Sequence, residues 1–144
     1  MIDSILLVDD ENLFHLVFED VCSILDFDLE LQIVQSTDKA ENLFKKWQAE
    51  PDKKPRCMFV DLNVLGSSFD GIELIRKLNQ DYGNGVVVGI ISSSADHVEQ
   101  QRAREVGAQF WIVKDERIEP LLEDFKKDFP AYKDKSAPFK VYEN

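Results

Sequence analysis

Five short apolar segments alternate with five stretches of helical periodicity, and this alternation constrains the fold of the chain more than any other feature. Four of the segments are continuous and rich in branched or aromatic residues, which is typical of strands buried on both faces of a parallel sheet. The segment 29–34 alternates apolar and polar residues instead, so we expect it at an edge of the sheet. The expected strands span residues 5–8, 29–34, 57–60, 86–91 and 110–113.

Each expected strand precedes a segment with apolar residues at helical spacing. The apolar face of the first helix is marked by Leu13, Phe14, Val17, Phe18, Val21, Ile24 and Leu25. Asp70 followed by Glu73 resembles a capping box at the start of the third helix, Gly107 is a typical C-terminal cap of the fourth, and Pro130 is expected to end the fifth. Strict alternation with right-handed crossovers predicts a doubly wound α/β domain, with helices on both faces of a parallel sheet.

Length and charge exclude several classes of function. A chain of 144 residues fits one domain, which we expect over residues 1–129, with residues 130–144 as a C-terminal tail without an output domain. That tail is either flexible or an aromatic strap packed on the body. The formal net charge of -11 repels nucleic-acid phosphates, so we expect no nucleic-acid partner. No apolar run approaches the roughly 20 residues of a membrane span and no secretory signal precedes the first strand, so we expect no membrane partner and a cytoplasmic location.

Polar residues follow the expected strands at their carboxyl ends, where open parallel sheets bind ligands. They are Asp9, Asp10 and Glu11 after the first strand, Asp61 and Asn63 after the third, Ser92 after the fourth, and Lys114 after the fifth. Carboxylates about 4 Å apart repel by about 4 kcal/mol at an effective dielectric near 20, so either one or more of them is protonated or a metal ion neutralises them. Oxygen ligands without His or Cys favour Mg²⁺, which would neutralise an incoming phosphoryl group together with Lys114. Asp61 is then a candidate nucleophile for an aspartyl phosphate.

The chain resembles the receiver domain of two-component response regulators, of the stand-alone type similar to the chemotaxis regulator. The resemblance covers residues 5 to about 129 and implies a flavodoxin-like sheet of five strands, in the order 2-1-3-4-5, with five helices. Its motifs are Leu6-Leu7-Val8-Asp9-Asp10-Glu11, Val60-Asp61-Leu62-Asn63, Asp70-Gly71, Ser92, and Gly107-Ala108 through Val113-Lys114.

The resemblance implies a phosphorylated aspartate beside a bound metal. Asp61 would be the phosphorylation site. Asp10 and Asp61 would ligate Mg²⁺, Asp9 would act mainly through a metal-bound water, and Asn63 would contribute its backbone carbonyl.

It also implies residues that sense the phosphoryl group. The Ser92 hydroxyl would bond a new phosphoryl oxygen, Lys114 would pair with the group, and Trp111 would be the switch aromatic that turns inward when Ser92 moves. The implied function is signalling and not enzymatic turnover of a substrate. A sensor histidine kinase or phosphotransfer protein would supply the phosphoryl group, and a downstream protein would bind the face formed by the fourth helix, fifth strand and fifth helix. Homodimer formation stays open.

Three departures from the family pattern favour an alternative, a phosphorylation-independent receiver-like interaction module. The loop from Asp61 to Asp70 is about two residues longer than usual, Ser93 stands where Ala or Gly is common, and Asp115 replaces the proline expected after Lys114. None of these changes removes a reactive group, so phosphorylation remains our main prediction.

Other chemistries have weaker support. An aspartate-nucleophile phosphohydrolase needs an Asp-x-Asp pair after its first strand, and the segment 9–12 does not offer one. His15 and His97 have no partner at metal-ligand spacing, so we expect both on the surface. Cys22 and Cys57 are expected to be small buried apolar residues.

Overall fold

A computed structural model describes residues 3–27, 30–83 and 85–144. The described residues form one parallel sheet in the order β2-β1-β3-β4-β5-β6, together with five α-helices and a 3₁₀ turn. The strands are β1 (Ser4–Val8), β2 (Glu30–Val34), β3 (Cys57–Val60), β4 (Val87–Ser92), β5 (Phe110–Val113) and β6 (Lys140–Tyr142). The helices are α1 (Asn12–Ile24), α2 (Thr37–Ala49), the 3₁₀ turn η1 (Pro51–Lys53), α3 (Gly71–Asp81), α4 (His97–Glu105) and α5 (Ile118–Lys133).

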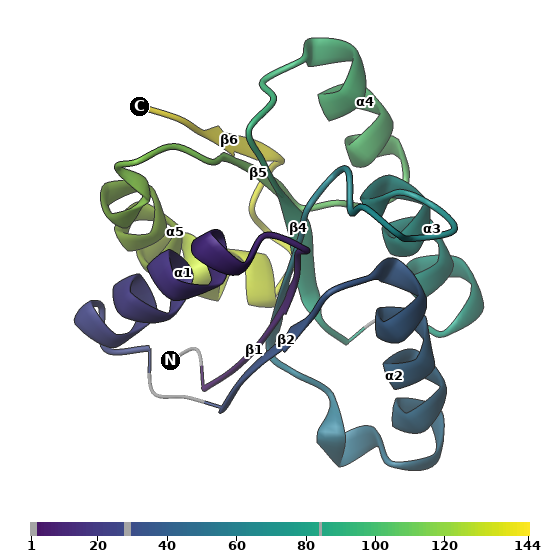
Figure 1. Ribbon diagram of the computed structural model, residues 1–144. Coiled ribbons are helices and arrows are strands. Elements are labelled where there is room, and N and C mark those ends of the chain that lie inside the picture. Colours follow the sequence, from purple (N-terminus) through teal and green to yellow (C-terminus); the bar gives the residue numbers. More distant parts are fainter. Residues whose placement is uncertain (1–2, 28–29, 84) are drawn as a thin grey trace.

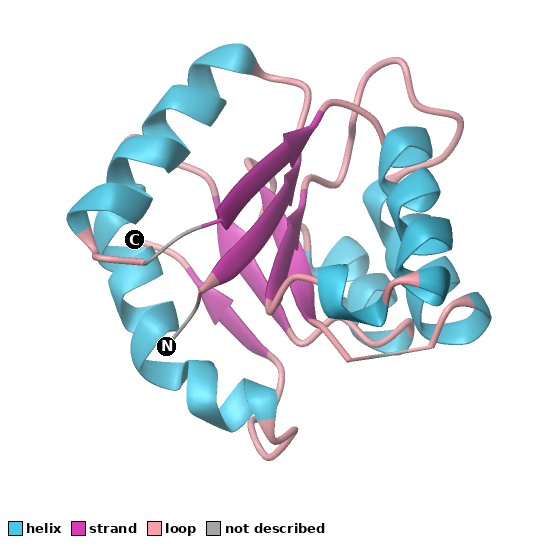
Figure 2. Cartoon of the chain, turned by 90° about the horizontal axis from the view of Figure 1, so that it is seen from below, coloured by secondary structure: helices cyan, strands magenta, loops and turns pink. Residues whose placement is uncertain are grey.

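The helices lie in two layers around the sheet. Figure 1 shows α1 and α5 on one face and α2, α3 and α4 on the other, and Figure 2 shows the sheet between them from below. The predicted doubly wound α/β class and the order of the first five strands are confirmed. Because helices cover both faces, every residue of β3 and β4 is buried. The exposed and half-buried residues of β2 confirm that it is an edge strand, although residue 29 of the expected segment lies outside the described residues.

The two faces of the sheet carry two separate apolar clusters. Towards α1 and α5, aromatic rings pack around Phe59, whose centroid lies 5.3 Å from Phe18, 5.3 Å from Phe125 and 5.4 Å from Phe110. Towards α2, α3 and α4, the fully buried Trp111 belongs to the second cluster. Each buried large side chain contributes roughly 1.5–3 kcal/mol, so these clusters hold the strand ends in place.

A sixth strand, β6, corrects the expected count of five. It pairs in parallel with β5, with Phe110 opposite Lys140 and Ile112 opposite Tyr142. Of the two expectations for the tail, this is the packed strap. The sequence pattern did not predict this strand, because β6 has only three residues and is too short to show the apolar run or alternation that marks a strand.

The expected end of the fifth helix at Pro130 is wrong, because α5 continues through it to Lys133. A proline inside a helix removes a backbone donor and crowds the preceding turn, at a cost of about 3 kcal/mol. Phe129 and Tyr132, on the same turn of the helix as Pro130, are buried at 3% and 1% exposure, and their packing outweighs that cost. The caps predicted at Asp70 and Gly107 are confirmed: the Asp70 carboxylate accepts from Glu73 N at 2.8 Å, and Gly107 has a φ of 98°.

The apolar face predicted for the first helix is only partly buried. Leu13 and Ile24 are 76% and 67% exposed, whereas His15 and Cys22 are buried. The apolar arc of the sequence is therefore wider than the surface that the sheet and α5 cover, and contacts with α5 decide which part of it faces inward.

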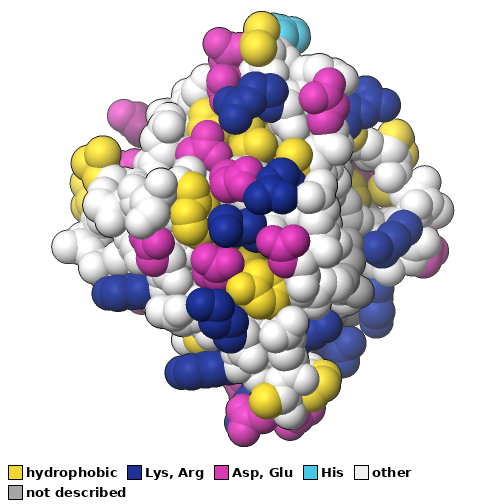
Figure 3. All heavy atoms as spheres, turned by 90° about the vertical axis from the view of Figure 1, so that its right-hand side faces the viewer, with side chains coloured by type: hydrophobic (Ala, Val, Ile, Leu, Met, Phe, Trp, Pro, Cys, Tyr) yellow, Lys and Arg dark blue, Asp and Glu magenta, His cyan; other side chains and the backbone are white. Residues whose placement is uncertain are grey.

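Charged side chains alternate over the face that carries α2, α3 and α4 (Figure 3). Their ion pairs are Arg76–Glu73, Lys77–Glu41, Arg102–Asp70 and Arg102–Glu99. Pairs of this kind contribute about 0–1 kcal/mol each, so they shape the surface more than they stabilise the fold. Among the described helices, none combines the length and apolar character needed to cross a bilayer.

Candidate functional site

Side chains from the carboxyl ends of β1, β3 and β5 meet at one edge of the sheet. β1 and β3 are neighbours with Val8 opposite Val60, so the next residues, Asp9 and Asp61, emerge side by side. Lys114 follows β5, and its Nζ lies 2.5 Å from Asp9 Oδ2 and 2.9 Å from Asp61 Oδ2. Both carboxylates are buried, at 0% exposure for Asp9 and 6% for Asp61. Three of the predicted site residues thus form one ion-paired group.

Burial and charge set the protonation of this group. Burial raises the pKa of Asp61 to about 6, with Lys114 opposing the rise and Asp9 adding to it. Burial also works against the charged form of Lys114, but its contacts with Asp9 and Asp61 outweigh burial and raise the pKa of Lys114 above its ordinary value. At neutral pH, the site therefore holds an ionised Asp61 beside a permanent ammonium.

A third carboxylate, that of Glu11, completes an acidic group that could hold a metal ion. Carboxylate oxygens of Asp9, Glu11 and Asp61 all lie within 4.8 Å of one another. Lys114 Nζ donates to Glu11 Oε1 at 3.0 Å. Three carboxylates against one ammonium leave 3 − 1 = 2 net negative charges, which matches a divalent cation.

The chemistry of the donor atoms fits Mg²⁺. Asp9 Oδ2 is buried and its partner is the Lys114 ammonium, which a bound cation would share with it. All three donors are hard oxygens, which Mg²⁺ prefers. Asp10, predicted as a direct ligand, is half-buried and lies outside this group. Its role as a ligand stays a prediction, as does that of the Asn63 carbonyl.

Ser92 and Trp111 are both hydrogen-bonded to Ser94, in the loop between β4 and α4. Ser92 ends β4 and is buried, and its hydroxyl accepts from Ser94 N at 3.2 Å. The indole Nε1 of Trp111 donates to the Ser94 carbonyl at 2.9 Å, and its ring is fully buried. A displacement of Ser92 would therefore reach Trp111 through Ser94.

The long loop after Asp61 is held by the start of α2. Thr37 N donates to Ser67 Oγ at 2.9 Å, and Thr37 Oγ1 donates to the Phe69 carbonyl at 2.7 Å. Ser68 N donates to Asp38 Oδ2 at 2.9 Å. The loop that carries Asn63 is thus docked on the protein body.

The position after Asp70 has no room for a side chain, and Gly71 occupies it. A Cβ atom there would overlap the backbone carbonyl oxygen of Asp61 and lie 2.8 Å from a methyl group of Val60. Any side chain at this position would push on the residue that we predict to be phosphorylated.

Two residues of α1 line the site although the sequence pattern assigned neither of them to it. The expectation that His15 lies on the surface is wrong: it is buried, with Nε2 2.7 Å from the Asp9 carbonyl oxygen. The ring of Phe14 lies beneath Lys114, with Nζ 4.3 Å from the ring centroid. The polar character of His15 concealed its position, because helical spacing alone places residues 14, 15 and 18 on one side. His97 is exposed, as predicted, and both cysteines are buried.

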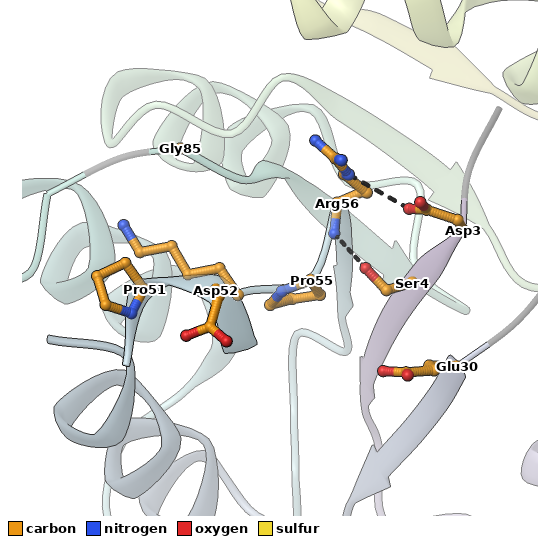
Figure 4. A pocket seen from close by; sticks show the side chains of 9 residues that line it. Asp3, Ser4, Glu30, Pro51, Asp52, Pro55, Arg56 and Gly85 are labelled. Carbon is orange, nitrogen blue, oxygen red and sulfur yellow. Dashed lines mark hydrogen bonds and ion pairs between the residues drawn. The ribbon is translucent and has the colours of Figure 1, made fainter. Parts of the chain in front are cut away.

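A hollow lies at the opposite, amino-terminal edge of the sheet and has a volume of about 550 Å³ (Figure 4). Arg56 Nε pairs there with Asp3 at 3.3 Å, and Arg56 N donates to Ser4 Oγ at 2.9 Å. Asp3 and Arg56 are both more than half exposed, so this hollow lacks the buried, converging groups of the site around Asp61.

The family model of the response regulator receiver domain matches residues 5–126. The chain belongs to the response regulator receiver family. Receiver domains are signalling domains, and the predicted resemblance is confirmed. A comparison with curated proteins found no match.

Solved structures of response regulators share the fold of this receiver domain. The phosphorylated cyanobacterial phytochrome response regulator RcpA is 14% identical with a TM-score of 0.73, and the match covers 91% of this chain and 96% of that one. The Mn²⁺-bound response regulator Rcp1 is 21% identical with a TM-score of 0.65, covering 92% and 90% of the two chains. NtrX from Brucella abortus is 25% identical with a TM-score of 0.74, covering 94% of this chain and 28% of that one.

Proposed function

We propose that this receiver domain accepts a phosphoryl group on Asp61 from a sensor histidine kinase or phosphotransfer protein, with Mg²⁺ bound beside it, and signals by binding another protein. The observation that carries the proposal is the buried Asp61 carboxylate, which Lys114 contacts at 2.9 Å and which lies in the acidic group with Asp9 and Glu11. A nucleophile, a cation for the transferred group and a cluster of metal-binding oxygens are therefore side by side.

The chain's own residues have distinct tasks in this reaction. An ionised Asp61 oxygen forms a bond to phosphorus as the bond between phosphorus and the donor nitrogen breaks. Lys114, already bonded to Asp61, stays beside the new phosphoryl oxygens and offsets their charge. Ser92, at the end of the neighbouring strand β4, supplies a hydroxyl that bonds a new phosphoryl oxygen.

Metal binding involves the same edge of the sheet. Asp9, Asp10, Asp61 and the Asn63 carbonyl would hold Mg²⁺, with Glu11 close enough to take part. When bound, Mg²⁺ offsets the negative charge of the transferred group. Rcp1, whose fold this chain shares, is described as Mn²⁺-bound, and RcpA as phosphorylated.

Intact-mass analysis tests the proposal. Incubation with a small phosphodonor and Mg²⁺ should add one phosphoryl group to the wild-type chain and none to Asp61→Asn. An undiminished adduct in Asp61→Asn, or its absence from the wild-type chain, would contradict the proposal.

A phosphorylation-independent interaction module is the second candidate. Lys114 already pairs with all three carboxylates of the acidic group, so it offsets part of their charge before any metal or phosphoryl group is present. Titration with Mg²⁺ separates the candidates, with Trp47→Phe used to isolate the fluorescence of Trp111. A phosphoacceptor should show a saturable change in Trp111 emission, and a degenerate module should show none.

The fourth helix, fifth strand and fifth helix are the expected surface for a downstream protein. In the structure, β6 covers the edge of β5 within this surface. A partner on this side of the molecule, in the cytoplasm as we propose, would therefore meet α4, β6 and α5.

A further inference from the structure

The C-terminal strand β6 lies along the edge of β5 as a ribbon with two different faces. Val141 and Phe139 pack against the cluster that contains Trp111, and Val141 lies opposite Trp111 in the register. Tyr142 points to the other face, where its ring lies 5.9 Å from that of Phe125. Figure 1 shows this strand in yellow at the side of the sheet, beside β5. Residues 139–142 thus contact the protein as an extended peptide would, with alternate side chains entering alternate faces.

A buried polar contact fixes this segment to α5. The Tyr142 hydroxyl donates to Asp128 Oδ2 at 2.6 Å and lies 2.9 Å from the Tyr132 hydroxyl. Lys140 Nζ donates to the same Asp128 oxygen at 2.9 Å. Tyr142 is 3% exposed and Tyr132 is 1% exposed, so both hydroxyls depend on this network for their partners.

The strand itself is short and follows a turn with an unusual backbone conformation. β6 has three residues, and the turn that leads into it places Lys135 at a φ of 62°, in the left-handed region that opposes a residue with a side chain. Short edge strands with few backbone bonds open at a lower free energy than the core does. The docked strand is therefore a separable unit held mainly by Tyr142 and its partners.

The far end of the segment contacts the loop that follows Lys114. Asn144 Nδ2 donates to Asp115 Oδ2 at 2.9 Å and to the Arg117 carbonyl at 2.9 Å. Asp115 directly follows Lys114, whose ammonium contacts Asp61. Residues 139–144 therefore contact both the strand that carries Trp111 and the loop that begins at Lys114.

We propose that the edge of β5 is a docking surface for an extended segment, that residues 139–144 occupy it in cis, and that their docking is linked to the state of the Asp61 site through Asn144 and Asp115. Release of the segment exposes unpaired backbone groups of β5, to which an extended peptide with the same apolar–basic–apolar–tyrosine pattern could bind. The link to the site rests on the proposed function, whereas the docking of the segment does not.

Hydrogen–deuterium exchange of the full-length chain tests the docking surface. Tyr142→Phe keeps the ring and removes the hydroxyl, so we expect exchange in β5 and β6 to become about 10-fold faster or more. Tyr82→Phe is the matched control, because it removes a hydroxyl bond of 3.0 Å to Glu41 on the other face of the sheet. A synthetic peptide of residues 137–144 should slow the exchange of β5 in Tyr142→Phe. Unchanged exchange in Tyr142→Phe, or no effect of the peptide, overturns the docking surface.

The link is tested on the same full-length chain with a phosphodonor and Mg²⁺. Samples in which intact mass shows the adduct should exchange at β6 with a rate at least about 3-fold different from that of the unmodified chain. Asn144→Ala should abolish this difference, and Glu143→Ala, which changes an exposed neighbour, should retain it. Equal rates with the adduct present overturn the link alone. A missing adduct overturns the proposed function and the link with it, while the docking result stands.

Discussion

Lys114 is the residue on which the charge balance of the site depends. Its side chain is 8% exposed and contacts Asp9, Glu11 and Asp61, which otherwise repel one another. Removing one partner of a buried charge group leaves the others unpaired, at a cost of about 3–5 kcal/mol. We therefore expect Lys114→Met to lower the free energy of unfolding in urea by about that amount and to slow phosphorylation of Asp61.

Arg102→Met is the control for Lys114→Met. Arg102 also pairs with two acids, Asp70 and Glu99, but its side chain is 48% exposed. Exposed pairs contribute about 0–1 kcal/mol, so this variant should stay close to the wild type. Equal losses in the two variants would show that Lys114 acts as an ordinary surface charge.

Gly71 sets the position of Asp61 through its lack of a side chain. In Gly71→Ala, the new methyl group overlaps the Asp61 carbonyl oxygen, and crowding of this kind costs about 1–3 kcal/mol. Thermal unfolding should show that loss, and the rate of adduct formation should fall because Asp61 is displaced. Gly85→Ala, whose new methyl group meets Lys54 Nζ at 3.7 Å and no nearer atom of the described residues, should change neither quantity.

At the scale of elements, the contact between α2 and the loop after β3 holds the residues that follow Asp61. Thr37 is fully buried, and its hydroxyl is the donor to the Phe69 carbonyl. Thr37→Val leaves that carbonyl unpaired, so we expect a loss of about 1–3 kcal/mol in urea unfolding and weaker Mg²⁺ binding. Thr37→Ser keeps the hydroxyl and should retain most of the stability. Equal Mg²⁺ affinity in wild type and Thr37→Val would show that the loop does not position metal ligands.

Pro130 gives a second test at this scale, because α5 continues past it. Replacing it by alanine removes a cost of about 3 kcal/mol in the helix. It also gives the unfolded chain more conformational freedom, which lowers the free energy of unfolding by about 0.4–1 kcal/mol. Pro130→Ala should therefore raise the free energy of unfolding by about 2 kcal/mol. Pro120→Ala, in the first turn of the same helix, should have little effect because proline is tolerated there. A destabilised Pro130→Ala would mean that the proline packs favourably.

At the scale of the whole molecule, the acidic character of the chain makes stability depend on cations. The net charge is -11, and the acidic group of Asp9, Glu11 and Asp61 adds local repulsion. A ligand that binds only the folded state at ten times its Kd stabilises it by about 1.4 kcal/mol, which raises the Tm of a domain of this size by about 3–6 °C. We expect Mg²⁺ to raise the Tm by this amount more than NaCl of equal ionic strength does. Asp9→Asn should reduce the difference, and an identical rise in NaCl would contradict a specific site.

The fold was predictable to the extent that it depends on local patterns. The apolar segments and the helical spacing after each one are properties of neighbouring residues, and five strands and five helices follow from them. β6 was missed because its stability comes from Tyr142 and Asp128, which lie 14 residues apart. The continuation of α5 through Pro130 was missed for a related reason, since the burial of Phe129 and Tyr132 outweighs a local rule.

The residues of the candidate site also fall into those that the sequence predicted and those that only the structure revealed. The sequence by itself determined which polar residues stand at the carboxyl ends of the strands, because strand ends are marked along the chain, and so it led to Asp9, Asp61 and Lys114. Only the tertiary structure decided that Glu11 joins the acidic group, that His15 is buried against Asp9, and that the C-terminus reaches Asp115. These outcomes depend on the rotation of α1 against α5 and on contacts between distant segments, and no periodicity within either segment contains that information.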